Sequence, residues 1–144
     1  MPDLSRRRFL ECTAAAGCSA LVLGGCTNGA PVDGTVTPTG GMVVLTFAMY
    51  PKLATVGGGV VVDAGSGPIA VLRTADTMAT ALSAVCTHQG CTLEVQSSGT
   101  APLYCACHGS EFAESGVVIR GPARTSLRVY QATVDANGVT VVVA

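Results

Sequence analysis

The chain alternates between short apolar stretches and short polar or glycine-containing stretches, and this pattern predicts β-strands. The apolar stretches are rich in valine and threonine, residue types that favour pleated, half-buried segments. Glycine, proline, asparagine and aspartate separate them, and the segment 135–138 (DANG) has the composition of a tight turn. The expected strands are 42–47, 60–63, 69–73, 80–85, 93–96, 103–105, 117–120, 128–134 and 139–143.

Strands at this spacing predict an all-β sandwich or barrel, because no stretch has a sustained helical period. Segment 74–81 has room for one helical turn at most. Met42, Met49 and Met78 are spaced irregularly and are expected to fill gaps in the core. A length of 144 residues predicts a single folded domain, which we place at 42–144.

The N-terminal region has the composition of an export signal. Residues 5–10 read SRRRFL and precede an apolar run over 12–25, so the three-part pattern of a signal peptide covers 1–25. The arginine pair is similar to a twin-arginine signal, and a general secretion signal is the alternative. The apolar run is shorter than the roughly 20 residues of a membrane-spanning helix, which disfavours a permanent transmembrane anchor.

Cys26 and the residues after it suggest how the domain is held. Residues 23–26 (LGGC) resemble a bacterial lipobox, which makes Cys26 a candidate for lipid attachment. The alternative is an ordinary cysteine in a signal that is cut elsewhere or retained. Segment 26–41 is rich in threonine, proline and glycine and is expected to be a flexible tether, or else a disordered stub left by processing.

The charge balance excludes one class of partner. The formal net charge is −1, and no basic stripe is present to neutralise phosphates, so we expect no nucleic-acid binding.

The two histidines of the chain both lie in cysteine-containing boxes. Residues 86–91 read CTHQGC and residues 105–110 read CACHGS. Together the boxes offer two thiolates and two imidazoles to one site. That ligand set suits a [2Fe–2S] cluster in which two histidines replace two cysteines on one iron.

Both boxes resemble those of the Rieske iron–sulfur proteins, which read C-T-H-x-G-C and C-x-C-H-G-S. Residues 121–123 (GPA) also resemble the proline loop that covers the cluster in this family. The resemblance implies stacked antiparallel sheets, with a cluster-binding part at about 84–123 inserted between two strands. It also implies one [2Fe–2S] cluster per chain.

The resemblance also assigns roles to the box residues. It implies that Cys86 and Cys105 bind the buried iron and that His88 and His108 bind the outer iron. It leaves Cys91 and Cys107 as a disulfide, which an oxidising, exported setting would favour.

Four further residues are expected to tune the cluster. Ser110 matches the family serine that donates a hydrogen bond to a bridging sulfide, and Pro122 belongs to the covering loop. Phe112 stands where high-potential members have tyrosine, so one hydrogen bond is missing and a lower potential is predicted. Gln89 replaces a shielding apolar residue and either wets the cluster edge or contacts a partner.

Three arginines, Arg120, Arg124 and Arg128, recur every four residues around the proline loop. They either form a docking patch for an acidic partner or belong to an ordinary solvated rim.

These features predict an exported one-electron carrier, not an enzyme on its own. We expect it at the outer face of the cytoplasmic membrane or in the periplasm, held by a lipid anchor or the signal segment. There it would exchange electrons with a cytochrome, a larger oxidoreductase subunit or a quinol.

Three other functions agree less well with the sequence. A Rieske ferredoxin that serves an oxygenase is disfavoured by the signal-like segment and the extra cysteine pair. An oxygenase needs a second iron held by two histidines and a carboxylate, and both histidines are already used. An exported β domain without redox chemistry, stapled by a disulfide or holding zinc, would lack iron and acid-labile sulfide.

Overall fold

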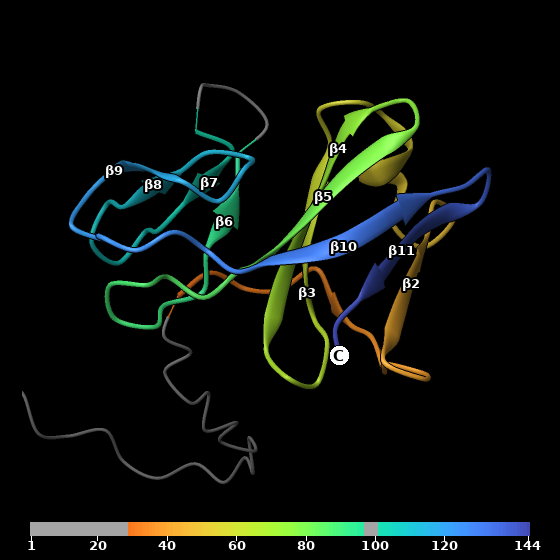
Figure 1. The fold of residues 1–144 in the computed structure, drawn as a ribbon, viewed down its shortest axis with the longest axis horizontal. Helices are drawn as coiled ribbons and strands as arrows, with labels where there is room; N and C mark the ends of the chain where they lie inside the picture. Colours follow the sequence, from red (N-terminus) through yellow and green to blue (C-terminus); the bar gives the residue numbers. More distant parts are fainter. Residues whose placement is uncertain (1–28, 97–100) are drawn as a thin grey trace, which may run out of the picture.

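The protein consists of two β-sheets, a large one of seven strands and a small one of four (Figure 1). The structure is a computed structural model that describes residues 29–96 and 101–144. The described residues contain no α-helix, and a single 3₁₀ turn, η1, covers Pro51–Ala54. The predicted all-β class is therefore confirmed.

The large sheet has the strand order β1-β3-β4-β5-β10-β11-β2. Its strands are β1 (Gly34–Thr35), β2 (Met42–Thr46), β3 (Gly59–Asp63), β4 (Pro68–Ala75), β5 (Met78–Ser83), β10 (Val129–Val134) and β11 (Gly138–Val142). The short β1 pairs with β3 in parallel, and every other pair is antiparallel.

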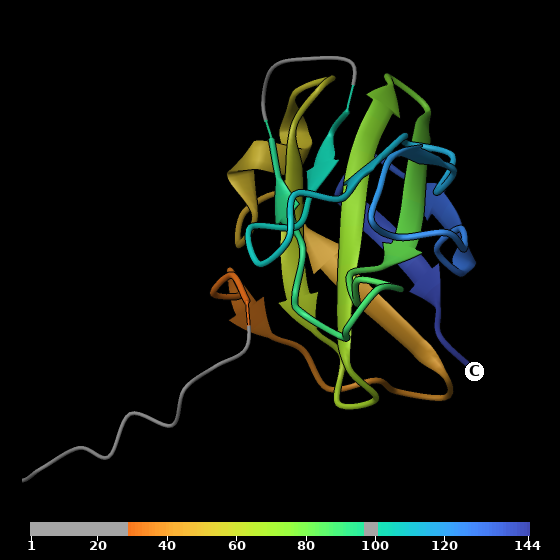
Figure 2. The same cartoon turned by 90° about the vertical axis from the view of Figure 1, so that its left-hand side faces the viewer.

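The small sheet is an insertion between two neighbouring strands of the large one. β5 and β10 pair directly, with Val129 opposite Leu82, although 45 residues separate Ser83 from Val129. The intervening chain forms β6 (Glu94–Val95), β7 (Leu103–Tyr104), β8 (Glu111–Phe112) and β9 (Val118–Arg120). Figure 2 looks onto this small sheet, with β3, β4 and β5 behind it. The predicted insertion is thus confirmed.

Strands β3 and β4 are apolar on both faces because each face belongs to a different core. On one face, Val61, Ala70 and Leu72 pack in a cluster that includes Leu93 and the other buried residues of the small sheet. The alternate residues of the same strands pack in a second cluster with the inward face of β2 and β11. A strand covered on both sides reads as a continuous hydrophobic run instead of an alternating one.

The segment before β2 contacts the domain, which differs from the tether expected over 26–41. The Asp33 carboxylate accepts a hydrogen bond from Val61 N–H at 2.9 Å and pairs with Lys52 Nζ at 2.9 Å. Two residues of β1 then extend the large sheet. The sequence pattern misses this contact because it depends on backbone groups of β3 and on one carboxylate.

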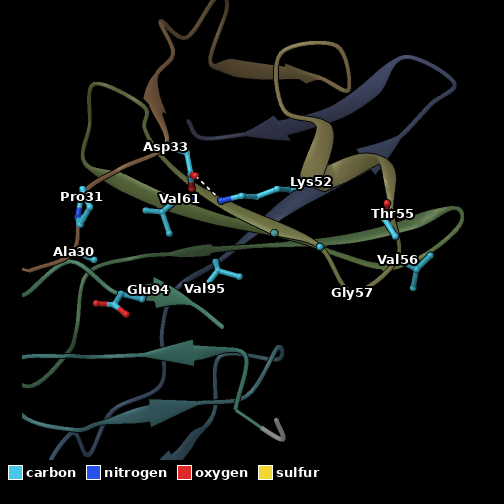
Figure 3. Close-up of a pocket in the computed structure, with 12 residues that line it drawn as sticks. Ala30, Pro31, Asp33, Lys52, Thr55, Val56, Gly57, Val61, Glu94 and Val95 are labelled. Atoms are coloured by element: carbon cyan, nitrogen blue, oxygen red, sulfur yellow. Dashed lines mark hydrogen bonds and ion pairs between the residues drawn. The ribbon is translucent and has the colours of Figure 1, made fainter. Parts of the chain in front are cut away.

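The same segment lines a hollow of about 690 Å³ on the side of the molecule (Figure 3). The Asp33–Lys52 pair lies on one wall, and Glu94 and Val95 of β6 lie on another. Neither cysteine- and histidine-containing box contributes to the lining, so this hollow is separate from the candidate site.

Two smaller expectations were wrong. Segment 74–81 forms no helical turn, because β4 continues through a hairpin in which Ala75 pairs with Met78. The methionines do not fill the core: Met42, Met49 and Met78 are 45%, 75% and 62% exposed. Met42 lies on the outward face of β2, and the other two lie in or beside turns.

Two predictions lie outside the described residues, namely the signal segment 1–25 and the lipid-attachment candidate Cys26. Within the part of the chain that is described, no helix has the length and apolar character to cross a bilayer.

Asp33 offers a test of the contact between the N-terminal segment and the domain. We expect Asp33→Ala to lower the free energy of unfolding by about 1–2 kcal/mol, because it leaves the Val61 N–H without its charged acceptor. Lys52→Gln removes only the exposed ion pair and should cost less than about 1 kcal/mol. Urea unfolding followed by circular dichroism measures both, and equal losses in the two variants would contradict this assignment.

Candidate metal centre

The two boxes form loops with the same pattern of backbone hydrogen bonds. In each box the first cysteine donates its N–H to the carbonyl oxygen five residues later, at 2.8 Å from Cys86 and 2.9 Å from Cys105. Its own carbonyl oxygen accepts the N–H of the glycine four residues later, at 2.8 Å in both boxes. Cys86 and Cys105 therefore occupy equivalent positions in two similar loops.

Glycine is required in both loops for backbone conformation. Gly90 and Gly109 have φ angles of 76° and 78°, in the left-handed region that other residues rarely adopt. A Cβ atom added at either position would meet no atom within 4 Å, so space is not the constraint.

The first cysteines of the two boxes are buried, unpaired thiols. Cys86 is 2% exposed and Cys105 is fully buried, and both lie in the core beneath the small sheet. Burial raises the pKa of the Cys105 thiol, and its hydrogen bond with Cys86 raises this pKa further. The backbone N–H groups of His108 and Cys107 point at the same sulfur and act in the opposite direction.

The two histidines are exposed and lie against each other. The ring centroids of His88 and His108 are 4.9 Å apart, and the rings are nearly perpendicular at 87°. The site therefore has two sulfur donors inside the protein and two imidazole donors at its surface.

The remaining two cysteines form the predicted disulfide. Cys91 and Cys107 are bonded, at a sequence separation of 16 residues. Their sulfurs and that of Cys105 all lie within 4.8 Å of one another. Because the bonded pair has no free thiol, Cys105 is the member of this group that can bind a metal.

Each of these contacts joins one box to the other. The two buried thiols, the two histidines and the two disulfide cysteines are three pairs, each with one member in each loop. The donor set of two thiols and two imidazoles fits a [2Fe–2S] cluster with mixed cysteine and histidine ligation.

A third segment, 121–125, is tied to both boxes. The Thr87 hydroxyl donates to the Thr125 carbonyl oxygen at 2.6 Å, and Ala123 N–H donates to the Ser110 hydroxyl oxygen at 3.0 Å. The Gly121–Pro122 peptide within this segment is cis. Because Ser110 accepts from Ala123, its hydroxyl hydrogen is available to a second acceptor.

The other two tuning candidates differ in burial. Phe112 is fully buried and packs in the same core cluster as both free cysteines, whereas Gln89 is exposed beside His88. The sequence interpretation missed the contact between Thr87 and Thr125. A threonine inside the first box was visible, but its partner 38 residues away was not.

Comparisons with known proteins agree with this geometry. The family model described as the Rieske [2Fe-2S] domain matches residues 50–131. The cytochrome b6-f complex iron-sulfur subunit of Synechococcus sp. (strain JA-3-3Ab) is 50% identical over 58 residues, which is 40% of this chain. The corresponding subunit of Prochlorococcus marinus (strain MIT 9515) is 43% identical over 60 residues, or 42% of the chain. In both comparisons the match spans a third of the relative's length (33%).

Solved structures give the same fold. The plasma membrane Rieske protein PetC3 from Synechocystis PCC 6803 matches with a TM-score of 0.52 and 31% identity, over 58% of this chain and 84% of that one. A chain of the complex of reduced oxygenase and oxidized ferredoxin in carbazole 1,9a-dioxygenase matches with a TM-score of 0.53 and 28% identity, over 61% and 82%. The ferredoxin of carbazole 1,9a-dioxygenase from Nocardioides aromaticivorans IC177, at 20% identity and a TM-score of 0.53, shares the fold over 68% and 92%.

The disulfide should contribute measurably to stability. We expect the double variant Cys91→Ala/Cys107→Ala to lose about 3 kcal/mol of unfolding free energy, the value for a closed loop of about 15 residues. Urea unfolding at equal metal content measures the loss. Reduction of the unmodified protein should reproduce it, and a double variant as stable as the oxidised protein would contradict the expectation.

Proposed function

The chain belongs to the Rieske [2Fe-2S] domain family and is a Rieske iron–sulfur electron-transfer protein, and on this basis we propose how it holds its cluster. Cys86 and Cys105 bind one iron through their thiolates, and His88 and His108 bind the other through neutral imidazoles. The observation that supports this assignment is the pairing of each of these residues with its counterpart from the other box.

The burial of the four side chains indicates where electrons enter and leave. The sulfur ligands are enclosed by the core, whereas both imidazoles are exposed. When bound, the cluster supplies a one-electron redox centre, with family potentials from about −150 to +300 mV. Electrons therefore enter and leave at the exposed edges of His88 and His108.

The surrounding residues exclude water and hold the loops in place. The disulfide links the two loops covalently, and segment 121–125 is hydrogen-bonded to both of them. The hydroxyl hydrogen of Ser110 would be available to the cluster, where a hydrogen bond to sulfide would raise the potential. Pro122 covers the site as part of the same segment, and Gln89 lies at its exposed edge.

We propose that the protein works outside the cytoplasm as a membrane-associated carrier. The disulfide supports this location, because such bonds persist in oxidising compartments. A twin-arginine signal at 1–25 would export the folded domain, and a lipid on Cys26 would anchor it. We propose that residues 42–144 form the Rieske domain and that residues 29–36 contact it.

The proposed partners follow from the relatives. Two of these are subunits of cytochrome b6-f complexes, and one is a plasma membrane Rieske protein. The match covers a third of the length of those subunits, so the complex to which this chain belongs is proposed here and not taken from them. We propose a cytochrome, a larger oxidoreductase subunit or a quinol as donor or acceptor.

The alternative function is that of a ferredoxin that donates electrons to an oxygenase. The structural likeness to a chain of the oxygenase–ferredoxin complex supports it. We favour the exported carrier because of the disulfide and the N-terminal sequence.

The cluster assignment is tested by analysis of the purified protein and two variants. We expect two irons and two acid-labile sulfides per chain, with an electron paramagnetic resonance signal on reduction. His88→Ala should abolish the signal, whereas Gln89→Ala, a neighbouring exposed position, should retain it. A protein that holds zinc or no metal would refute the proposal.

A potentiometric titration then separates the two functions, since a midpoint well above zero supports the exported carrier and one near the lower limit supports the ferredoxin.

Phe112 provides a quantitative prediction for the potential. In Phe112→Tyr, a hydroxyl added to this buried ring should donate to a cysteine ligand and stabilise the reduced form. We expect the midpoint to rise by roughly 40–60 mV, the one-electron equivalent of a hydrogen bond of about 1–1.5 kcal/mol. Phe112→Leu removes the ring without adding a donor and serves as the control. An unchanged midpoint in the tyrosine variant would show that the hydroxyl does not reach the ligand.

A further inference from the structure

The three arginines around the proline loop have different surroundings. Arg120 pairs with Glu111 at 3.2 Å, so its charge is compensated. The guanidinium of Arg128 lies over the ring of Tyr130, at 5.0 Å from the centroid, which keeps its charge. Arg124 is exposed and has neither a hydrogen-bond nor an ion-pair partner among the residues that the structure describes.

Arg124 lies beside the exposed edge of the metal centre. Together with Thr87, His88, Pro122 and Thr125 it lines a hollow of about 320 Å³ between the first box and segment 121–125. A group that enters this hollow would meet an imidazole on one side and an uncompensated guanidinium on the other. A carboxylate matches both, because a guanidinium binds it through two parallel hydrogen bonds.

The basic side chains of the domain are concentrated in the same region. The described residues carry five basic and seven acidic side chains, and three of the five basic ones lie within 120–128. Of the other two, Lys52 is paired with Asp33, and Arg73 is buried with its guanidinium on backbone carbonyl groups.

Of the seven acidic side chains, two lie in turns away from the metal centre, whereas Glu94, Glu111 and Glu114 belong to the inserted part, and Glu111 is paired with Arg120. Asp76 lies in the turn between β4 and β5, and Asp135 lies in the turn between β10 and β11. Figure 1 shows these turns on the opposite side of the molecule from the small sheet and its loops. An oxidised cluster with two thiolates would have no net charge, so Arg124 and Arg128, which have no ion-pair partner among the described residues, leave segment 121–128 positively charged.

We infer that the face formed by His88, Pro122 and Arg124 docks on an acidic surface of the redox partner, with Arg124 bound to a carboxylate next to the exposed histidine. The positive charge of Arg124 and Arg128 attracts an acidic partner to this face before contact and raises the rate of productive encounters. The inference rests on the proposed function, since it takes the histidine edge as the exit for electrons.

Oxidation of the reduced protein by small charged complexes tests the sign and the position of the charge. The probes are hexacyanoferrate(III), an anion, and tris(1,10-phenanthroline)cobalt(III), a cation. Each accepts one electron from the reduced protein, with no bond made or broken. With the anionic probe, we expect Arg124→Gln to lower the rate about two- to fivefold at low ionic strength, the effect of one exposed charge pair. The decrease should disappear in high salt.

The matched control is Lys52→Gln, which removes the same charge at the hollow that neither box lines. Its rate with the anionic probe should stay within the error of the unmodified protein. With the cationic probe, Arg124→Gln should react no more slowly than the unmodified protein. Equal effects of Arg124→Gln and Lys52→Gln would overturn the inference, because they would report net charge alone.

A binding measurement separates this inference from the proposed function. We expect a fluorescein-labelled hexaglutamate peptide to bind at low salt, as followed by anisotropy, and to bind about two- to fivefold more weakly to Arg124→Gln than to Lys52→Gln. Absent or equal binding would overturn the inference while the cluster signal stays intact. Loss of the cluster signal in the unmodified protein would instead refute the proposed function.

Discussion

Strands β3 and β4 have apolar side chains on both faces, and the rest of the structure depends on this constraint. The side chains on one face pack in the core of the large sheet, and those on the other face pack against the small sheet. An insertion of short strands with few internal contacts could not bury enough surface to be stable alone. The insertion is ordered because this face of β3 and β4 supplies apolar contacts to Leu93, Leu103 and Phe112.

Packing against the same face of β3 and β4 explains why the sulfur ligands are buried and the histidines are exposed. The loops approach the core with their first cysteines, so the thiols are buried among leucine and alanine side chains. The histidines follow two and three residues later and reach the surface. A ligand set with sulfur inside and nitrogen outside is therefore a consequence of loop direction. Segment 121–125 completes the enclosure because it is hydrogen-bonded to both loops.

Most strands could be predicted from the sequence because they depend on local composition, and the disulfide because the two boxes resemble those of the Rieske family. Prediction from the sequence fails where a feature depends on distant partners. Strand β1 and the Asp33 contact require backbone groups of β3, and the two-residue β8 has no pattern of its own. The exposed methionines show the same limit, since irregular spacing does not reveal which side of a strand faces a core. Arg120 and Arg124 also look equivalent in the sequence and differ only through Glu111.

The disulfide cysteines and the proposed cysteine ligands are different residues, although each of these two pairs has one member in each loop. Cluster insertion consequently does not need the covalent bond, and the bond does not consume a ligand. A chain loaded in a reducing compartment can acquire its disulfide later, where thiols oxidise. In the proposed exported carrier, cluster insertion would therefore precede disulfide formation, and the covalent bond would then close a pair of loops that already hold their ligands.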